Sequence, residues 1–256
     1  MAKLRLWLLL GLLLIVVLVA RCTGGPEPDW SRTLVVAVHP YAAGSDEDSD
    51  EGDLSQWTRF GQDRLDAISE FFAREAQRHN PGIEKPFRLV LGDELDRAPD
   101  APSDGGVLAR IRWGFRMRWW RWRLGREVNQ SDILVVARFQ STPPAGDVLH
   151  SVGSADLGMV VANVPAAEAQ HDYAQVLLAH EILHTVGALD LYDPATGLPI
   201  FPAGYAEPNR EPRYPQEQAE LMAGRIPLAP GRATQATDLS QVTIGRRTAR
   251  EIGWVE

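Results

Sequence analysis

The chain has 256 residues, enough for one large domain or two small ones, and 45% hydrophobic and 23% charged residues are typical of a packed globular protein. This composition excludes a mostly disordered chain. A net charge of −8 argues against a general nucleic-acid binder, because neutralising phosphates requires a cationic surface. The single cysteine excludes an intramolecular disulfide framework and any metal site built from several thiolates. Any bound metal must therefore be held by histidines and carboxylates.

The first 22 residues have the layout of a membrane segment rather than of a part of the fold. Lys3 and Arg5 precede an uncharged run over residues 6–20, which Arg21 ends. We predict an uncleaved membrane anchor, with a cleaved signal peptide or a lipoprotein acylated at Cys22 as the alternatives. Since the two basic residues favour a cytoplasmic N-terminus, the rest of the chain is expected outside the cytoplasm.

Glycine and proline between residues 23 and 31 predict a tether. We therefore divide the chain into an anchor or signal at residues 1–22, a tether at 23–32 and one domain at 33–256. A nearly continuous apolar run predicts a buried strand over residues 33–39. The acidic stretch at 46–53 is interpreted as a solvated loop, because a calcium loop requires glycine where Glu51 stands.

Further along, strands and helices alternate. Apolar residues three or four apart predict a helix over residues 57–79, and apolar runs predict strands at 87–91, 132–139 and 158–164. After about residue 190 the chain is rich in proline and irregular, with a short closing helix expected at 248–253. This order of elements predicts one α/β domain.

Residues 107–124 predict a helix of unusual composition, with four tryptophans and six arginines between positions 110 and 123. Two apolar stripes lie on nearly opposite sides of it, with arginines between them. One stripe consists of Leu108, Ile111, Phe115, Trp119 and Trp122, and the other of Trp113, Met117, Trp120 and Leu124. Two interpretations stay open: a helix sandwiched between the core and an overlying segment, or an Arg/Trp face that lies against a membrane or a partner.

Residues 173–186 predict a helix that contains the pattern His-x-x-x-His at His180 and His184. Because positions i and i+4 lie on one helical face, both imidazoles can bind one metal ion. Glu181, adjacent to the first histidine, can act on water at the metal rather than on the metal itself. This pattern predicts a metal site of hydrolytic type.

A third ligand has to approach from outside this helix. Gly187 can take a left-handed conformation that ends the helix, after which Asp190 comes back toward the metal. The alternative third ligands are glutamates further along the chain: Glu207, Glu217 and Glu220. The last two are expected in a possible short helix after Pro215.

The string HEILHTVGALD resembles the HExxHxxGxxH/D motif of the metzincin zinc peptidases, in the form that ends in Asp. The resemblance covers residues 173–224 and extends to bacterial membrane-anchored proteins of the same type. It implies a zinc-dependent endopeptidase in which His180, His184 and Asp190 bind Zn²⁺ and Glu181 is the general base. The substrate is then a peptide or protein, and the domain lies on the periplasmic or cell-surface side of a bacterial inner membrane.

The same resemblance implies an α/β (α+β) fold: a twisted mixed sheet with backing helices, an active-site helix and a loop-rich C-terminal part. It assigns Gly187 to the turn after that helix. It also implies a methionine in a tight turn beneath the metal, for which Met222 is the candidate. The rival hypothesis is a catalytically inactive, membrane-anchored protein that keeps the zinc fold and binds an envelope partner through the Arg/Trp-rich helix. Glu181 discriminates, because a scaffold does not need a base beside the metal.

Other residues near the motif allow more modest interpretations. Asp193 is expected in a turn at the rim of the site, with a calcium-type second site as the alternative. Three tyrosines could stabilise an oxyanion or simply pack: Tyr192, Tyr205 and Tyr214. His150 and His171 are expected to be ordinary surface or loop histidines. No GxSxG, P-loop or GxGxxG motif is present, so serine hydrolase, NTPase and dinucleotide-binding functions lack support.

Overall fold

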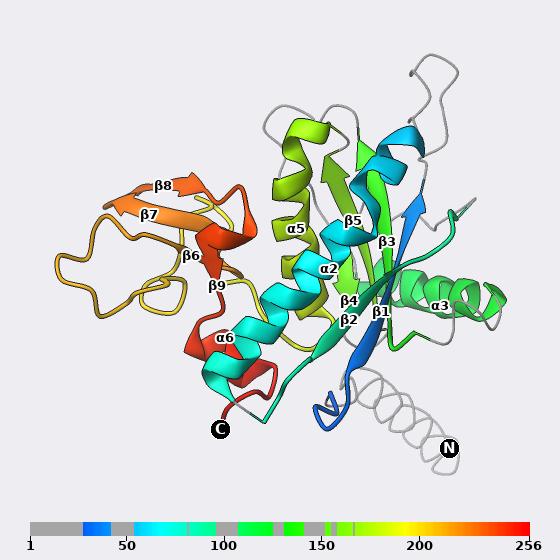
Figure 1. Ribbon diagram of the computed structural model, residues 1–256, viewed down its shortest axis with the longest axis horizontal. Coiled ribbons are helices and arrows are strands. Elements are labelled where there is room, and N and C mark those ends of the chain that lie inside the picture. The colour runs from blue at the N-terminus through cyan, green and yellow to red at the C-terminus, as the bar shows by residue number, and fades with distance from the viewer. Residues whose placement is uncertain are drawn as a thin grey trace, which may run out of the picture.

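The computed structural model describes residues 28–41, 54–80, 82–95, 107–124, 131–140, 152–154, 158–165 and 167–256. A central sheet has helices on both faces, and a smaller C-terminal part with short two-stranded sheets lies beside it (Figure 1). The predicted anchor at 1–22 and the acidic stretch at 46–53 lie outside the described residues. Among the helices of the described segments, none is both long and apolar enough to cross a membrane.

The central sheet has the strand order β2-β1-β3-β5-β4. The first four strands are parallel, and β4 runs antiparallel to β5 at one edge. The strands are β1 (Leu34–Tyr41), β2 (Phe87–Leu91), β3 (Ile133–Gln140), β4 (Val152–Ser154) and β5 (Met159–Pro165). The four strands predicted from apolar runs are confirmed within two residues, because covered parallel strands are apolar on both faces. Strand β4 was not predicted, since three residues carry no periodic pattern.

Two helices cover one face of the sheet, α2 (Leu54–His79) and α5 (His171–His184) (Figure 1). Their apolar residues join those of β1, β3 and β5 in the larger hydrophobic core. Gly61, with φ 65° and ψ 168°, interrupts the helical backbone of α2, so that α2 consists of two helical pieces. The predicted helix at 57–79 is thus confirmed, with a kink near its beginning.

The opposite face is covered by α3 (Val107–Arg123). Trp113 and Met117 are buried there in a second core with alternate residues of β3 and β5. Three residues of the other apolar stripe are not covered: Phe115, Trp119 and Trp122 are 66%, 57% and 74% exposed. The hypothesis of a helix sandwiched between two layers is therefore wrong for this part of α3.

The C-terminal part is built from short elements separated by turns. These are β6 (Ala219–Glu220), β7 (Arg225–Ala229), β8 (Arg232–Gln235), β9 (Val242–Thr243) and α6 (Arg246–Glu251), with a single 3₁₀ turn at η3 (Leu239–Gln241). Another 3₁₀ turn, η2 (Glu168–Gln170), directly precedes α5. Strand β6 pairs with β9, and β7 forms a hairpin with β8. The possible helix after Pro215 is wrong, since residues 219–220 lie in a strand. The closing helix predicted at 248–253 is present slightly earlier, as α6.

The last residues of the predicted tether contact the folded domain. The indole N–H of Trp30 donates to the carbonyl of Ile252 at 2.7 Å. Its ring packs edge-on against Phe87 and Trp254. Arg32 forms two hydrogen bonds of 2.6 and 2.9 Å with the Asp132 carboxylate. The chain is thus attached, before β1 begins, to the end of the sheet at which β2 and β3 also begin.

Candidate metal centre

Helix α5 presents two histidines from its last turns. His180 and His184 lie one turn apart, and their side chains are 15% and 21% exposed. Their Nε2 atoms are 3.1 Å from each other. Most of the other residues of α5 are buried against the sheet and α2, which fixes the direction in which the two imidazoles point.

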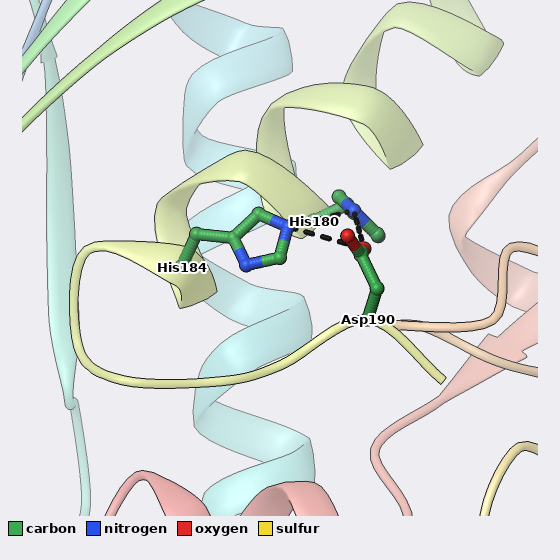
Figure 2. A group of neighbouring side chains, drawn as sticks. All are labelled: His180, His184 and Asp190. Atoms are coloured by element: carbon green, nitrogen blue, oxygen red, sulfur yellow. Dashed lines mark hydrogen bonds and ion pairs between the residues drawn. The ribbon is translucent and has the colours of Figure 1, made fainter. Parts of the chain in front are cut away.

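The chain reverses directly after α5. Ala188 N–H donates to the carbonyl of Leu183 at 3.1 Å, and Gly187 has φ 104°, a conformation that favours glycine. The reversal brings Asp190 to the histidines, with Oδ1 3.1 Å from His180 Nε2 and 3.3 Å from His184 Nε2 (Figure 2). Within the described part of the chain, these three residues form the one group of side chains that could hold a metal ion.

Backbone carbonyls fix the orientation of both rings. His180 Nδ1 lies 3.1 Å from the carbonyl oxygen of Leu221, and His184 Nδ1 lies 2.8 Å from that of Ala188. Because a carbonyl oxygen only accepts hydrogen bonds, each Nδ1 carries a proton, and in the neutral imidazole each Nε2 carries a lone pair. Two lone pairs and the Asp190 carboxylate therefore meet at one point, an arrangement that a cation stabilises. The residues present fit a metal ion.

The charges of the group act on one another. Burial opposes ionisation of Asp190, but hydrogen bonds from the doubly protonated imidazoles of His180 and His184, together with their charges, hold the pKa of its carboxyl well below its usual range. Burial lowers the pKa of His180, yet the hydrogen bond to Asp190, the charge of Glu181 and the contact with Leu221 together raise it. Asp190 is therefore ionised at neutral pH, as a metal ligand must be, and a bound metal ion would take the place of the protons on the two Nε2 atoms.

Glu181 and Tyr192 lie near this group without belonging to it. Glu181 is 8% exposed. Burial raises the pKa of the Tyr192 hydroxyl, and so do the charge of Asp190, a hydrogen bond to Asp190 and the charge of Glu181. Tyr192 is thus in contact with a residue of the metal group, and the Glu181 carboxylate is close enough to act on it electrostatically.

The turn that holds Met222 lies beside the first histidine. Met222 is fully buried, and its carbonyl accepts from Leu191 N–H at 3.0 Å, one residue after Asp190. The preceding carbonyl, of Leu221, is the partner of His180 Nδ1. Gly224, with φ 68°, ends the turn. This turn therefore contacts both the histidine and the aspartate segments of the candidate centre.

Glu220, considered above as a ligand, has another place. Its buried carboxylate accepts hydrogen bonds from Met222 N–H at 2.6 Å and Ala223 N–H at 3.2 Å, and from Gly245 N–H and the Thr248 hydroxyl at the start of α6. Burial raises its pKa to about 7, against the hydrogen bonds from Thr248, Gly245 and Met222. Glu220 thus ties the Met222 turn to α6.

Neither of the other two glutamates belongs to the metal group. Arg210 forms ion pairs with Glu207 at 2.8 Å and with Glu217 at 2.9 Å. Sequence reasoning missed the role of Glu220 and of the carbonyls of Leu221 and Ala188. Backbone carbonyls carry no sequence signal. The position of Glu220 two residues before Met222 is compatible both with a metal ligand and with a hydrogen-bond acceptor for the Met222 turn.

We expect Glu220→Ala to lower the free energy of unfolding by about 3–5 kcal/mol, because three backbone N–H groups and a hydroxyl lose their buried acceptor. In a domain of this size that corresponds to a fall in Tm of roughly 10 °C, measurable by thermal unfolding. Glu217→Ala is the control: its side chain is 74% exposed and contacts Arg210, so a change below about 1 kcal/mol is expected. Equal Tm values for the two variants would contradict the role of Glu220.

The remaining predicted residues have structural surroundings of their own. The hydroxyls of Tyr205 and Tyr214 lie 2.9 Å apart and bond each other. Asp193 accepts hydrogen bonds from Ala195 and Thr196 N–H and forms the expected turn. The prediction for His171 is wrong, because this histidine, the first residue of α5, is 1% exposed and packs against Phe60 of α2. His150 lies outside the described residues.

Comparison with known proteins adds little. No family model matches the chain, and no curated protein matches it. Among solved structures, a chain of the structure described as "Structure of a chaperone-substrate complex" aligns over 88% of this chain and 35% of its own length. The sequence identity is 12% and the TM-score is 0.36.

Proposed function

We propose that this chain is a zinc-dependent endopeptidase of the metzincin type, anchored in a membrane and acting outside the cytoplasm. The observation that carries the proposal is the convergence of His180 Nε2, His184 Nε2 and Asp190 Oδ1 at separations of 3.1 to 3.3 Å. A buried glutamate, Glu181, follows the first of these residues on the same helix.

The geometry supports zinc as the metal. For bonds of about 2.0–2.1 Å, two ligand atoms of a tetrahedral site are separated by about 3.3 Å, close to the observed spacing. Calcium prefers 6–8 oxygen ligands at about 2.3–2.6 Å, which two imidazoles and one carboxylate do not provide. Structural zinc sites have four protein ligands as a rule, whereas three are present among the described residues. Three ligands are typical of a catalytic zinc site.

Each residue has a role in the proposed reaction. Zinc, when bound, supplies a Lewis acid that polarises the peptide carbonyl and lowers the pKa of water toward about 7. Glu181 accepts the proton of the attacking water and then delivers it to the leaving amine. The carbonyls of Leu221 and Ala188 hold the imidazoles in the ligating tautomer.

The environment of the centre is consistent with this family. A mixed sheet of four parallel strands and one antiparallel edge strand, α2 and α5 packed on one face and a loop-rich C-terminal part agree with the fold that the motif implies. The buried Met222 in a turn that contacts His180 through Leu221 is the counterpart we propose for the family's methionine turn.

The proposal is tested on the full chain, purified in detergent, by metal analysis and a peptide-library cleavage assay. We expect zinc to copurify, cleavage to cease when a chelator removes it, and activity to return when zinc is added back. Cleavage that survives complete metal removal would refute a metal-dependent mechanism. Stoichiometric zinc without cleavage of any peptide would refute the peptidase.

The second candidate is the inactive zinc-fold protein that binds an envelope partner. The exposed Arg/Trp face of α3 favours it, because such a surface is suited to an interaction. Glu181 favours the enzyme, since a binding module has no use for a buried base next to a metal ligand.

Membrane attachment has its own test. Because the run at residues 6–20 is apolar, we expect the full chain to sediment with membranes and to stay there in high salt and in carbonate. Immunoblotting of the soluble and membrane fractions measures this. Recovery of a soluble form that lacks residues 1–22 would contradict the anchor and favour a cleaved signal peptide.

A further inference from the structure

The inner face of α3 is firmly attached to the sheet. Trp113 and Met117 are buried in the second core, and Trp120 and Leu124 pack against it. The guanidinium of Arg121 donates to the carbonyls of Gly158 and Ser131 at 3.0 and 3.1 Å. These contacts fix which side of α3 faces outward.

The outer face combines aromatic rings with cations. Phe115, Trp119 and Trp122 are spaced by four and three residues, so they lie on one side of the helix. Of the tryptophans whose exposure the structure describes, Trp119 and Trp122 are the two exposed ones. The arginines exposed around these rings are Arg112, Arg116, Arg118 and Arg123. By helical periodicity Arg118 lies on one flank and the other three on the opposite flank.

The charge of α3 is opposite to that of the whole chain. The segment Val107–Arg123 contains six arginines and no acidic residue, whereas the chain has a net charge of −8. An anionic surface is therefore attracted to α3 and repelled by the rest of an acidic protein. Exposed tryptophan and arginine together suit the boundary of a bilayer, where indole rings sit at headgroup level and arginine side chains reach the phosphates.

The path of the chain places this face near the predicted anchor. Arg121, near the end of α3, donates to the carbonyl of Ser131, and the next residue, Asp132, binds Arg32. The end of α3 and the entry of the chain into the domain thus share one end of the sheet. From Arg21, where the apolar run stops, to Arg32 the chain spans at most about 40 Å. The outer face of α3 can therefore reach the membrane in which the run at residues 6–20 is proposed to lie.

We propose that the outer face of α3 lies in the headgroup region of an anionic lipid bilayer. The inference uses the proposed membrane attachment for the position of the domain and does not depend on peptidase activity. Helix α5 covers the opposite face of the sheet (Figure 1), so this docking leaves His180, His184 and Asp190 on the side away from the membrane. A substrate then approaches the candidate centre from the aqueous phase.

The test uses single fluorescent labels in the full chain. Cys22, the single native cysteine, is replaced by serine, and an environment-sensitive dye is attached to Phe115→Cys or, as control, to Arg232→Cys in the exposed strand β8. The proteins are reconstituted in vesicles of phosphatidylcholine alone or of equal parts phosphatidylcholine and phosphatidylglycerol. We expect blue-shifted emission and quenching by nitroxide-labelled lipids at position 115 in the anionic vesicles, a weaker change in the neutral ones, and no change at position 232. Indistinguishable emission at the two positions in anionic vesicles would overturn the proposal.

A charge-reversal pair identifies the occupant. The α3 variant carries Arg112→Glu, Arg116→Glu and Arg123→Glu. The control carries the same charge change at exposed arginines elsewhere: Arg88→Glu, Arg232→Glu and Arg246→Glu. We expect the response at position 115 to be lost in the first and kept in the second, with peptide hydrolysis in detergent unchanged in both. A response that survives the α3 variant, or that appears in detergent and grows with protein concentration as for a second copy, overturns the assignment to anionic lipid. Carbonate extraction reports on the anchor separately.

Discussion

Glu181→Gln is expected to reduce peptide hydrolysis by about 10²–10⁴-fold or more, the contribution of a positioned general base. The amide has nearly the same shape as the carboxylate but cannot accept the proton of the attacking water. Zinc content should stay at the wild-type level, because the ligand atoms belong to His180, His184 and Asp190. The measurement is kcat/KM on a cleaved peptide, together with metal analysis of the same preparation.

Glu217→Gln provides the matched control, since it makes the same chemical change on an exposed side chain that pairs with Arg210. It should keep both activity and zinc. Loss of zinc together with activity in Glu181→Gln would mean that Glu181 binds the metal or holds the fold. The proposed division between ligands and base would then be wrong.

Local periodicity accounts for most of what the sequence could predict. The four apolar strands follow from burial on both faces, and His180 and His184 share a face because the α-helix has a fixed period. The return of Asp190 followed from one residue, Gly187, whose positive φ redirects the chain. Each of these inferences depends only on residues that lie close together in the sequence.

Long-range pairing accounts for what could not be predicted. The segment after Pro215 contains glutamate and glutamine, which favour helix, yet residues 219–220 pair with β9 more than twenty residues later. Glu220 consequently points into the Met222 turn and the start of α6 instead of toward the metal. Likewise, the sequence of α3 is the same whether Phe115, Trp119 and Trp122 are covered or exposed, so their exposure is visible only in the fold.

Asp190→Ala is expected to weaken zinc binding by more than about 100-fold, since removing even an outer-shell partner of a ligand costs about 10–100-fold. The reason is geometric. His180 and His184 provide two ligand atoms from one helix, and Asp190 Oδ1 completes the triangle from the chain that returns after Gly187. Competition with a chromogenic chelator measures the affinity, and activity should disappear with the metal.

Asp190→His distinguishes a lost ligand from a damaged fold. The Asp190 side chain is 42% exposed, so an imidazole has room there, and its nitrogen restores the ligand of the more common HExxHxxGxxH form. Zinc affinity should therefore recover in part relative to Asp190→Ala, whereas a purely structural role of Asp190 predicts no recovery.

Glu207→Ala and Glu217→Ala are the carboxylate controls, because both side chains pair with Arg210. Each should bind zinc as the wild type does. Full metal occupancy in Asp190→Ala, combined with loss of zinc in one glutamate variant, would place the third ligand elsewhere. The chain after Gly187 would then have to approach the histidines by a different path, and the assignment of Met222 to the turn beneath the metal would fail with it.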